Sequence, residues 1–398
     1  MSPKNIHFIT TYFHPVVAGL EMNSLQTYSF LVERGWKVSA HTTRNTPIQK
    51  NAFPKHGEIQ GIRINRYSQL FYSSFLFSFR NVNFKNSVII LHDFITFPGL
   101  FLFAFTFLLK MLNLKSYTLI LSSHGLFNYD PKVYSGLSFK LKRVIDRSIG
   151  VFLVNRSVDV IRAVSTTEKN GLVSGGIKSN LVQVVNNGIE KEAFEDIELK
   201  STDDVKAKVR GLGNYILQIG RIDRIKNQSI IVEALQYVKE TNQNFVLVGS
   251  EYDNQYKLEI AEIAKKLGVE KRLHFLGVVQ GYDKYYIIKN AKIVVHMALS
   301  EGFCNAVHEA MSQGVPCVVS RDTALEELIK DKVNGLIANS NNAIEIADKI
   351  NFLNDPANSN LIDIIKNNNI AYTKTHSWEQ VSYHVEDLIN SAIDKAKA

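Results

Sequence analysis

Short apolar runs of strand length, each followed by a polar or glycine-containing turn, recur along this chain with helical stretches between them. This alternation is typical of parallel sheets, because parallel neighbours need a long crossover connection that is usually a helix. The chain opens with strand 6–10, a loop, helix 25–32 and strand 36–42. Further buried strands are expected at 88–91, 117–122, 160–164, 182–185, 215–219, 244–248, 273–276, 293–296 and 316–319.

The strand and helix pattern is interrupted once. Residues 191–212 are dense in charge and poor in large apolar side chains, and the pattern resumes at about residue 213. A chain of 398 residues is also longer than one hydrophobic core usually supports. We therefore predict an α/β fold with two Rossmann-like, doubly wound domains, 1–190 and 213–375, facing a central cleft and joined by a linker at 191–212. Ligands of such sheets bind beyond the carboxyl ends of the strands.

Charge is distributed unevenly between the two halves. Residues 1–190 hold 21 Lys/Arg against 9 Asp/Glu, whereas the remainder holds 25 against 29. The basic first half favours an anionic partner there, and nucleic acid, acidic lipid headgroups and phosphorylated substrates all qualify. The two cysteines, Cys304 and Cys317, are too few for a disulfide framework or a metal cluster, and the sequence shows no leader pattern. We expect a cytoplasmic protein with reduced thiols.

The first candidate motif runs from Gln218 to Asn227. A strand ends at Gly220, where a ligand can approach the backbone, and Arg221 and Lys226 place two cations in the loop before the next helix. An arginine grips phosphate oxygens bidentately and a lysine adds a point charge, so the loop suits a diphosphate. A solvated basic turn is the alternative.

The second motif runs from Ser300 to Met311. Gly302 is expected in a strand-to-helix turn whose free N–H groups can face an anion. Glu301 belongs to the loop and Glu309 to the second turn of the helix, too far apart to share a proton at about 1.5 Å per helical residue. Carboxylates accept paired hydroxyl donors well, so a ribose diol and sugar hydroxyls are natural partners. A capping glutamate and a surface glutamate are the structural alternative.

Taken together, these motifs resemble the signature of retaining glycosyltransferase family 4, which has the GT-B fold. The features that carry the resemblance are Gly220-Arg221 with Lys226, the Glu301 and Glu309 pair, and Gly314-Val315-Pro316. The likeness extends over most of the chain. Other positions that match the family are Pro15, Gly19 and Glu21 in its N-terminal glycine-rich loop, Asn187-Gly188-Ile189-Glu190 between its domains, and Trp378 in its last helix, about 376–398, which would pack back onto the first domain.

The resemblance implies a role for each matching residue. Arg221 and Lys226 would bind the donor diphosphate, Glu309 the ribose and Glu301 the hydroxyls of the sugar ring. His124 matches the family's histidine at the catalytic cleft, with a core or turn histidine as the alternative. Further donor contacts would come from Gly19, whose loop approaches the phosphate, and from the backbone of Gly220, Gly302, Phe303, Cys304, Asn305 and Ala306.

Four positions depart from the family pattern. Ala18-Gly19 replaces a Gly-Gly pair, and Asn186 stands where proline is common. Asn227 replaces the glycine expected after the phosphate-binding lysine, and Cys304 stands where glycine or proline is frequent. The cysteine is therefore a candidate for tuning the choice of donor.

The reaction implied is sugar transfer with retention of anomeric configuration and without an enzyme nucleophile. The donor would be a UDP-sugar in preference to a GDP-sugar, carrying a hexose or N-acetylhexosamine, and the acceptor a glycan or a lipid-linked sugar of bacterial surface-polysaccharide or lipopolysaccharide synthesis. Asp93 would be the base if the reaction inverted instead. There is no Asp-x-Asp motif, so neither a cofactor nor a catalytic metal is expected.

A stretch from Phe94 to Leu112 is almost wholly apolar, with Pro98-Gly99 near its start and Lys110 near its end. A spanning helix fits its length but not these residues. Two interpretations stay open: a buried helix against the first sheet, or peripheral contact with an anionic membrane at the inner face of the cytoplasmic membrane. Basic residues that would support the contact follow at Lys140, Lys142, Arg143 and Arg147.

Two other classes of protein remain as alternatives. A sugar-nucleotide epimerase of the UDP-GlcNAc 2-epimerase type also has two such domains, although the spacing of Glu301 and Glu309 disfavours it. A nucleic-acid-binding protein would explain the basic half, but no reading module is recognisable, so nucleic acid is not expected as a partner.

Overall fold

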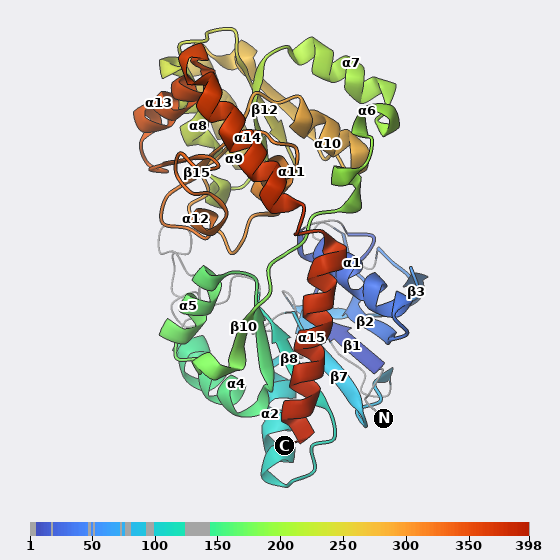
Figure 1. The fold of residues 1–398 in the computed structure, drawn as a ribbon. Helices are drawn as coiled ribbons and strands as arrows, with labels where there is room; N and C mark the ends of the chain where they lie inside the picture. The colour runs from blue at the N-terminus through green and yellow to red at the C-terminus, as the bar shows by residue number, and fades with distance from the viewer. Residues whose placement is uncertain are drawn as a thin grey trace. The chain divides into compact units, whose positions relative to one another are not determined.

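The computed structural model describes residues 5–16, 19–46, 49–50, 52–71, 74–75, 81–92, 99–123 and 144–397. The chain divides into two compact units, the first made of Met1–Gly188 with Trp378–Ala398 and the second of Ile189–Ser377 (Figure 1). Each unit holds a largely parallel sheet with helices packed on it. The predicted class, two α/β domains with parallel sheets, is confirmed.

The described part of the first unit contains an eight-stranded sheet in the order β10-β9-β8-β7-β1-β2-β4-β3. Neighbouring strands run parallel except β3 and β4, which form an antiparallel edge. The central strands are buried at every position, as expected where helices cover both faces of a parallel sheet. The strands are β1 (Asn5–Ile9), β2 (Lys37–Thr43), β3 (His56–Ile59), β4 (Ile62–Tyr67), β7 (Ser87–Leu91), β8 (Thr118–Ser122), β9 (Val160–Ala163) and β10 (Val182–Val184), with a separate hairpin of β5 (Gln69–Phe71) and β6 (Ser74–Phe75).

Two apolar layers cover this sheet. Alternate residues of β7 face opposite layers: Val88 and Ile90 join one core, and Ile89 and Leu91 join the other. Helices α1 (Gly19–Glu33) and α15 (Trp378–Lys397) belong to the first core, whereas α2 (Gly99–Met111) and α4 (Val151–Ser157) belong to the second. The remaining helical segments are η2 (Asp146–Gly150), α5 (Thr166–Ser174) and η3 (Ser179–Leu181).

The last helix, α15, is part of the first unit although the chain reaches it from the second. It packs along α1, as Figure 1 shows, and the indole N–H of Trp36 donates a hydrogen bond of 2.8 Å to Glu386. Gly188, the last residue before the chain leaves the unit, lies against Trp378, the first residue after it returns. A Cβ at Gly188 would stand 2.7 Å from the Trp378 Cα, so only glycine fits there.

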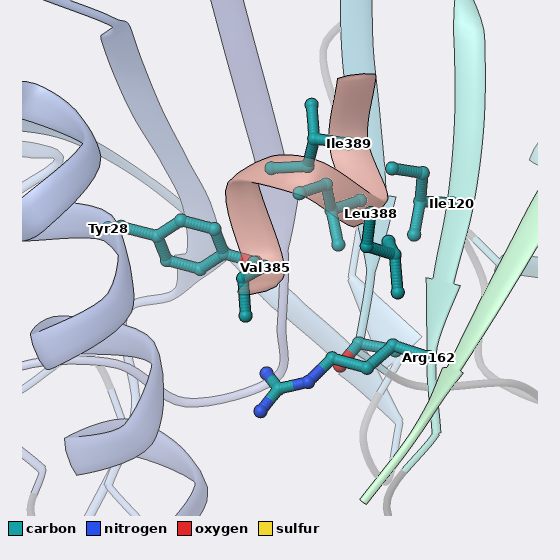
Figure 2. Close-up of a pocket in the computed structure, with 8 residues that line it drawn as sticks. Tyr28, Ile120, Arg162, Val385, Leu388 and Ile389 are labelled. Carbon is teal, nitrogen blue, oxygen red and sulfur yellow. The ribbon is translucent and has the colours of Figure 1, made fainter. Parts of the chain in front are cut away.

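A small cavity separates α15 from the sheet (Figure 2). Its wall combines the aliphatic side chains of Ile120, Val385, Leu388 and Ile389 with Tyr28 and Arg162. With a volume of about 10 Å³ it has room for roughly one water molecule, so it is no substrate pocket. Arg162 is buried and donates hydrogen bonds to the carbonyl oxygens of Val185 and Asn186, both 3.2 Å long, which fixes the segment that leads out of the unit.

The second unit is built on a six-stranded, wholly parallel sheet in the order β13-β12-β11-β14-β15-β16. Its strand order reverses beside β11, between β12 and β14, and this is where open α/β sheets bind ligands. The strands are β11 (Tyr215–Ile219), β12 (Asn244–Val248), β13 (Leu273–Gly277), β14 (Ile293–His296), β15 (Cys317–Ser320) and β16 (Leu336–Ala338).

Helices flank both faces of this second sheet. The α-helices that follow the strands are α8 (Gln228–Ala234), α9 (Asn254–Lys266), α10 (Gly281–Lys289), α11 (Asn305–Ser312), α12 (Leu325–Leu328), α13 (Ala343–Asn354) and α14 (Ser359–Thr373). Single 3₁₀ turns also occur at η5 (Arg224–Lys226), η6 (Leu235–Tyr237), η7 (Glu270–Arg272) and η8 (Pro356–Asn358).

The stretch 191–212, expected to be a linker, is helical and lies within the second unit. It forms η4 (Lys191–Phe194), α6 (Ile197–Lys200) and α7 (Asp203–Leu212). The Thr202 side chain caps α7 by accepting a hydrogen bond from the Val205 N–H. The charges that suggested a linker lie on the outer face of α7, whose inner face buries Val205, Val209 and Leu212.

Helix α2 accounts for residues 99–111 of the apolar stretch that begins at Phe94, and the residues before it lie outside the described part. Leu102, Phe103 and Thr106 are buried under the sheet, whereas Leu108 and Met111 are exposed. The helix is therefore partly core and partly surface. Among the described residues, no helix combines the length and apolar character that crossing a bilayer requires.

Candidate donor site

The loop after β11 holds the first cluster of predicted site residues. Gly220 follows β11 and Gly249 follows β12. A Cβ on Gly249 would lie 2.0 Å from the carbonyl oxygen of Gly220, so the two loops touch through glycine. Arg221 follows with about half of its side chain exposed and its guanidinium 4.7 Å from the centre of the Tyr252 ring. The guanidinium also lies 3.8 Å from the carboxylate of Asp223, with which it forms an ion pair. The requirement for glycine at 249 is visible only in the structure.

Lys226 ends the short helix η5 and points toward the loop after β14. Its ammonium group is hydrogen-bonded to Glu301, and its backbone carbonyl accepts a hydrogen bond of 3.0 Å from Gln218. The next residue, Asn227, is left-handed at φ 53°, a conformation that asparagine tolerates better than most side chains. The asparagine therefore supplies the backbone shape that glycine would supply.

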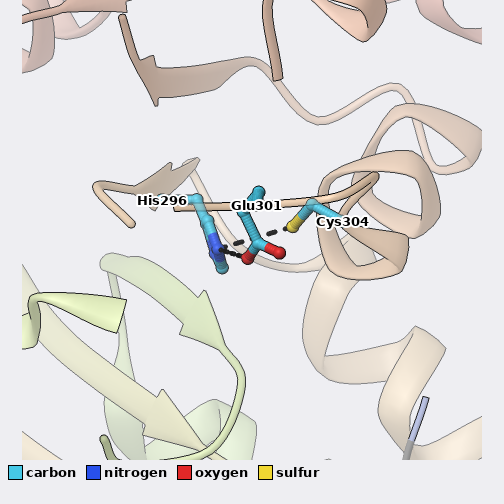
Figure 3. Close-up of side chains that lie close together, drawn as sticks. All are labelled: His296, Glu301 and Cys304. Atoms are coloured by element: carbon cyan, nitrogen blue, oxygen red, sulfur yellow. Dashed lines mark hydrogen bonds and ion pairs between the residues drawn. The ribbon is translucent and has the colours of Figure 1, made fainter. Parts of the chain in front are cut away.

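The loop after β14 places three functional side chains together (Figure 3). His296, the last residue of β14, donates a hydrogen bond of 2.8 Å from Nε2 to Glu301, and Cys304 Sγ lies 3.4 Å from the same nitrogen. Burial alone would raise the pKa of Glu301, but the Lys226 ammonium and the bond from His296 hold that pKa well below its usual range. Glu301 is therefore ionised and charge-paired.

Helix α11 begins directly after this loop and carries Glu309 on its second turn. Lys284 of α10 donates to Glu309 over 3.1 Å and to Glu190 over 2.6 Å, and the Tyr285 hydroxyl donates to Glu190 over 3.1 Å. One largely buried ammonium thus serves two largely buried carboxylates. Burial raises the pKa of Glu309 to about 7, with Lys284 opposing the rise and Glu190 adding to it.

The two glutamates consequently have separate partners. Glu301 is held by Lys226 and His296, and Glu309 by Lys284, so the two carboxylates share none of these partners. Sequence reasoning missed Lys284 and the bond from His296. For His296 the sequence offered one weak signal, its position at the end of a predicted strand. For Lys284 it offered none, because this lysine lies in a helix without a motif.

The remaining predicted residues are placed as follows. Gly302 and Cys304 lie in the loop before α11, Asn305 and Ala306 open that helix, and the Phe303 ring is buried with its centre 5.3 Å from that of His308. Gly19 begins α1 in the first unit and is exposed. His124 and Asp93 lie outside the described residues.

The fold has counterparts among known proteins. Over 97% of this chain and 99% of the other, the fold superposes with a TM-score of 0.73 on the crystal structure of Anabaena Alr3699/HepE in complex with UDP and glucose, at 18% sequence identity. Two units with parallel sheets and this likeness define the GT-B fold of glycosyltransferases. Residues 200–372 match the family described as Glycosyl transferases group 1, so the chain carries a domain of that family.

Two curated relatives from Escherichia coli align with part of the chain. A UDP-Gal:alpha-D-GlcNAc-diphosphoundecaprenol alpha-1,3-galactosyltransferase is 31% identical over 181 residues, 44% of this chain and 43% of the relative. An O-antigen chain mannosyltransferase B is 30% identical over 166 residues, 42% of each chain. The alignments thus span less than half the length of these relatives.

Proposed function

We propose that this chain is a glycosyltransferase that moves a hexose or N-acetylhexosamine from a UDP-sugar to a glycan or lipid-linked acceptor in bacterial surface-polysaccharide or lipopolysaccharide synthesis. The observation that carries the proposal is the pairing of Lys226 with Glu301 and of Lys284 with Glu309 within the matched domain. The galactosyltransferase relative is named for UDP-Gal and a diphosphoundecaprenol-linked sugar, which supports both the donor and the acceptor class.

In the mechanism we propose, Lys226 and Arg221 bind the diphosphate and stabilise the charge that develops on it as the bond from the anomeric carbon to the phosphate oxygen breaks. The acceptor oxygen bonds to that carbon on the same face, and its proton passes to the departing phosphate oxygen. Because the acceptor attacks from the face that the diphosphate leaves, configuration is retained without an enzyme nucleophile, as in glycosyltransferase family 4. Glu301 binds hydroxyls of the sugar ring, Glu309 binds the ribose diol, and no catalytic metal is required.

The proposal is tested with a panel of UDP- and GDP-sugars, each assayed with and without candidate acceptors and in the presence of EDTA. We expect turnover of a UDP-sugar to be unchanged by the chelator and to yield a product whose anomeric configuration, read by NMR, equals that of the donor. An inverted product contradicts the retaining mechanism. Conversion of the donor sugar into an epimer without any acceptor contradicts glycosyl transfer itself.

The affinity for UDP-glucose is expected to depend on pH through Glu309. The carboxylate accepts the ribose hydroxyls and the protonated form loses part of this capacity, so a pKa of about 7 makes affinity rise with pH up to that value and level off above it. One proton corresponds to at most about tenfold per pH unit. Calorimetric titration between pH 5.5 and 8.5 measures the effect. In Glu309→Gln the profile should be flat, and an equal slope there would exclude Glu309 as its origin.

We also propose that the first unit contacts the inner face of the cytoplasmic membrane, where lipid-linked acceptors reside. Exposed apolar side chains gather at the end of α2 and at η2 and α4, two segments that pack together through Phe107 and Phe152. We call this surface the apolar patch; its members are Leu108, Met111, Leu112, Leu114, Val144, Ile149 and Phe152. Arg147 and Arg156 lie on the same segments and would face anionic headgroups. Lys140, Lys142 and Arg143 lie outside the described residues.

Binding to anionic vesicles tests the membrane contact. The triple replacement of Met111, Leu112 and Leu114 by serine should lower the fraction that cosediments with phosphatidylglycerol vesicles at low salt by more than tenfold, because each apolar side chain contributes about 1 kcal/mol or more. The control is Leu199→Ser with Leu258→Ser, which removes two exposed apolar side chains of the second unit. Equal loss in both variants, or no binding by the unaltered protein, contradicts the proposal.

A further inference from the structure

The side chains of His296, Glu301 and Cys304 converge at the carboxyl end of β14 (Figure 3). His296 Nε2 lies 2.8 Å from a Glu301 oxygen and 3.4 Å from Cys304 Sγ, and one potential ligand atom from each residue lies within 4.8 Å of the other two. The three groups are an imidazole, a carboxylate and a thiol. Nitrogen, oxygen and sulfur together are a donor set that Zn²⁺ accepts.

Two of the three distances between these atoms are close to those around a tetrahedral ion, and the third, between Glu301 and Cys304, is at most 4.8 Å. Bonds of about 2.0–2.3 Å from Zn²⁺ to its ligands place neighbouring ligand atoms roughly 3.3–3.7 Å apart. The observed 3.4 Å between Cys304 Sγ and His296 Nε2 already lies in that interval, and the bond from His296 to Glu301 must lengthen by only about 0.5 Å. Three protein ligands leave a fourth position for water or another ligand.

The site already holds a positive charge, since the Lys226 ammonium is paired with the same Glu301 oxygen that His296 contacts. A divalent ion would take the place of that ammonium on Glu301. Among the described residues, Glu301 is the one ion-pair partner of Lys226. Because the lysine side chain is long and flexible, its ammonium can turn away when a metal ion binds. The thiol proton of Cys304 would be released to solvent as the thiolate binds the metal.

The backbone at Cys304 supplies an independent observation. This residue adopts φ 76° and ψ 83°, a left-handed conformation in which a Cβ costs about 1 kcal/mol and which glycine adopts freely. The sequence nevertheless places a cysteine there, with its sulfur directed at His296. A side chain kept in such a conformation is a candidate for a function that glycine lacks.

We propose that His296, Glu301 and Cys304 form a binding site for Zn²⁺, in which the ion displaces Lys226 and reversibly blocks the donor site. The ion is an inhibitor and not a cofactor of the transfer. Metal binding is independent of the proposed function. The competition with donor rests on that function, because Glu301 and Lys226 then serve the sugar and the diphosphate.

Metal binding is measured on the whole chain with Co²⁺ as a spectroscopic substitute for Zn²⁺. The unaltered protein should develop a thiolate-to-cobalt charge-transfer absorption that saturates at one Co²⁺ per chain and disappears when Zn²⁺ is added. Cys317→Ser is the matched control, since Cys317 is the second cysteine of the sequence and is buried in β15. It should keep the absorption, whereas Cys304→Ser should lose it and bind Zn²⁺ at least tenfold more weakly.

Cys304→Gly guards against misfolding as an explanation, because glycine adopts the backbone conformation at position 304 without strain. This variant should retain the thermal transition of the unaltered protein and still lack the cobalt absorption. An absorption that survives in Cys304→Gly, that vanishes in Cys317→Ser, or that never appears in the unaltered protein overturns the proposal.

Competition is tested by titrating UDP-glucose at a fixed Zn²⁺ concentration. The apparent Kd should rise at least tenfold in the unaltered protein and remain within about twofold in Cys304→Gly, which also controls for chelation of zinc by the free nucleotide. If Co²⁺ binds through Cys304 and UDP-glucose binds equally well with and without metal, the metal site stands and the block is overturned, along with the assignment of Glu301 and Lys226 to the donor. If UDP-glucose binds and the cobalt absorption is absent, the metal site alone fails.

Discussion

Replacement of Lys226 by alanine is expected to lower kcat/KM for sugar transfer by about a hundredfold to a thousandfold, the effect of removing one preorganised charge from a developing anion. Lys226 lies in η5, and its ammonium is paired with Glu301 in the free protein. In our assignment the ammonium contacts the departing diphosphate when the donor is bound. Its loss removes stabilisation that is largest in the transition state. The measurement is the release of UDP from UDP-sugar and acceptor at subsaturating donor.

Stability must be separated from catalysis in this experiment. Removing Lys226 leaves the buried carboxylate of Glu301 without its cation, which costs about 3–5 kcal/mol for a buried pair. The double variant Lys226→Met with Glu301→Gln removes both charges and should recover most of the lost thermal stability without recovering transfer. Arg224→Ala is the matched control, because this cation of the same short helix is half exposed and paired with Glu259. Near-normal kcat/KM in a folded Lys226→Ala variant would exclude the assigned role.

Glu309→Ala is expected to weaken nucleotide binding, whereas Glu301→Ala is expected to lower turnover. Loss of Glu309 should raise the Kd for UDP by about tenfold to a hundredfold, because hydrogen bonds to a charged acceptor contribute about 1.5–3 kcal/mol. Loss of Glu301 should leave the Kd for UDP within about threefold and lower kcat by about a hundredfold, because its assigned partner is the sugar ring, which UDP lacks. Calorimetry with UDP and steady-state kinetics with the full donor measure the two effects.

Lys284→Met is a second test of the assignment of Glu309 to the ribose. Lys284 has no assigned contact with the donor, but it holds Glu309 and Glu190 together through bonds of 3.1 and 2.6 Å. Its loss leaves two neighbouring carboxylates without a cation, so the pKa of Glu309 should rise further and UDP affinity at pH 7 should fall, with partial recovery at higher pH.

Unchanged activity in both Glu301→Ala and Glu309→Ala would remove the donor assignment altogether.

The sequence predicts six strands of the eight-stranded sheet and five of the six-stranded sheet, because the signal of these strands is local. The apolar run at 88–91 is recognisable without knowing its neighbours, and the structure places β7 there with every residue buried. Helix α7 was misinterpreted for the opposite reason: its three buried residues are outnumbered by charges that lie on its exposed face. Strands β3, β4 and β16 are not predicted. In β4, Arg63 and Arg66 interrupt the apolar residues, and β16 is a short Leu-Ile-Ala segment.

The candidate site is likewise predictable only in part: the sequence indicates the site residues but not their partners. Glu301 and Glu309 stand at a recognisable spacing, but the partners that set their charge come from distant positions. Lys284 reaches Glu309 across 25 residues, and Lys226 reaches Glu301 across 75. Burial of these pairs decides the protonation of Glu309, and burial is a property of the folded chain. The left-handed backbone of Cys304 is likewise invisible until the turn before α11 is built.

The return of α15 to the first unit has a practical consequence for dissecting the protein. A fragment ending at Gly188 would present to water the face of α1 and the strands that Val381, Val385, Leu388 and Ile389 cover in the whole chain. Such a fragment exposes a large hydrophobic surface and is expected to aggregate. The independently expressible form of this half is a spliced polypeptide in which Trp378–Lys397 is rejoined to Gly188, the point where the two segments already touch.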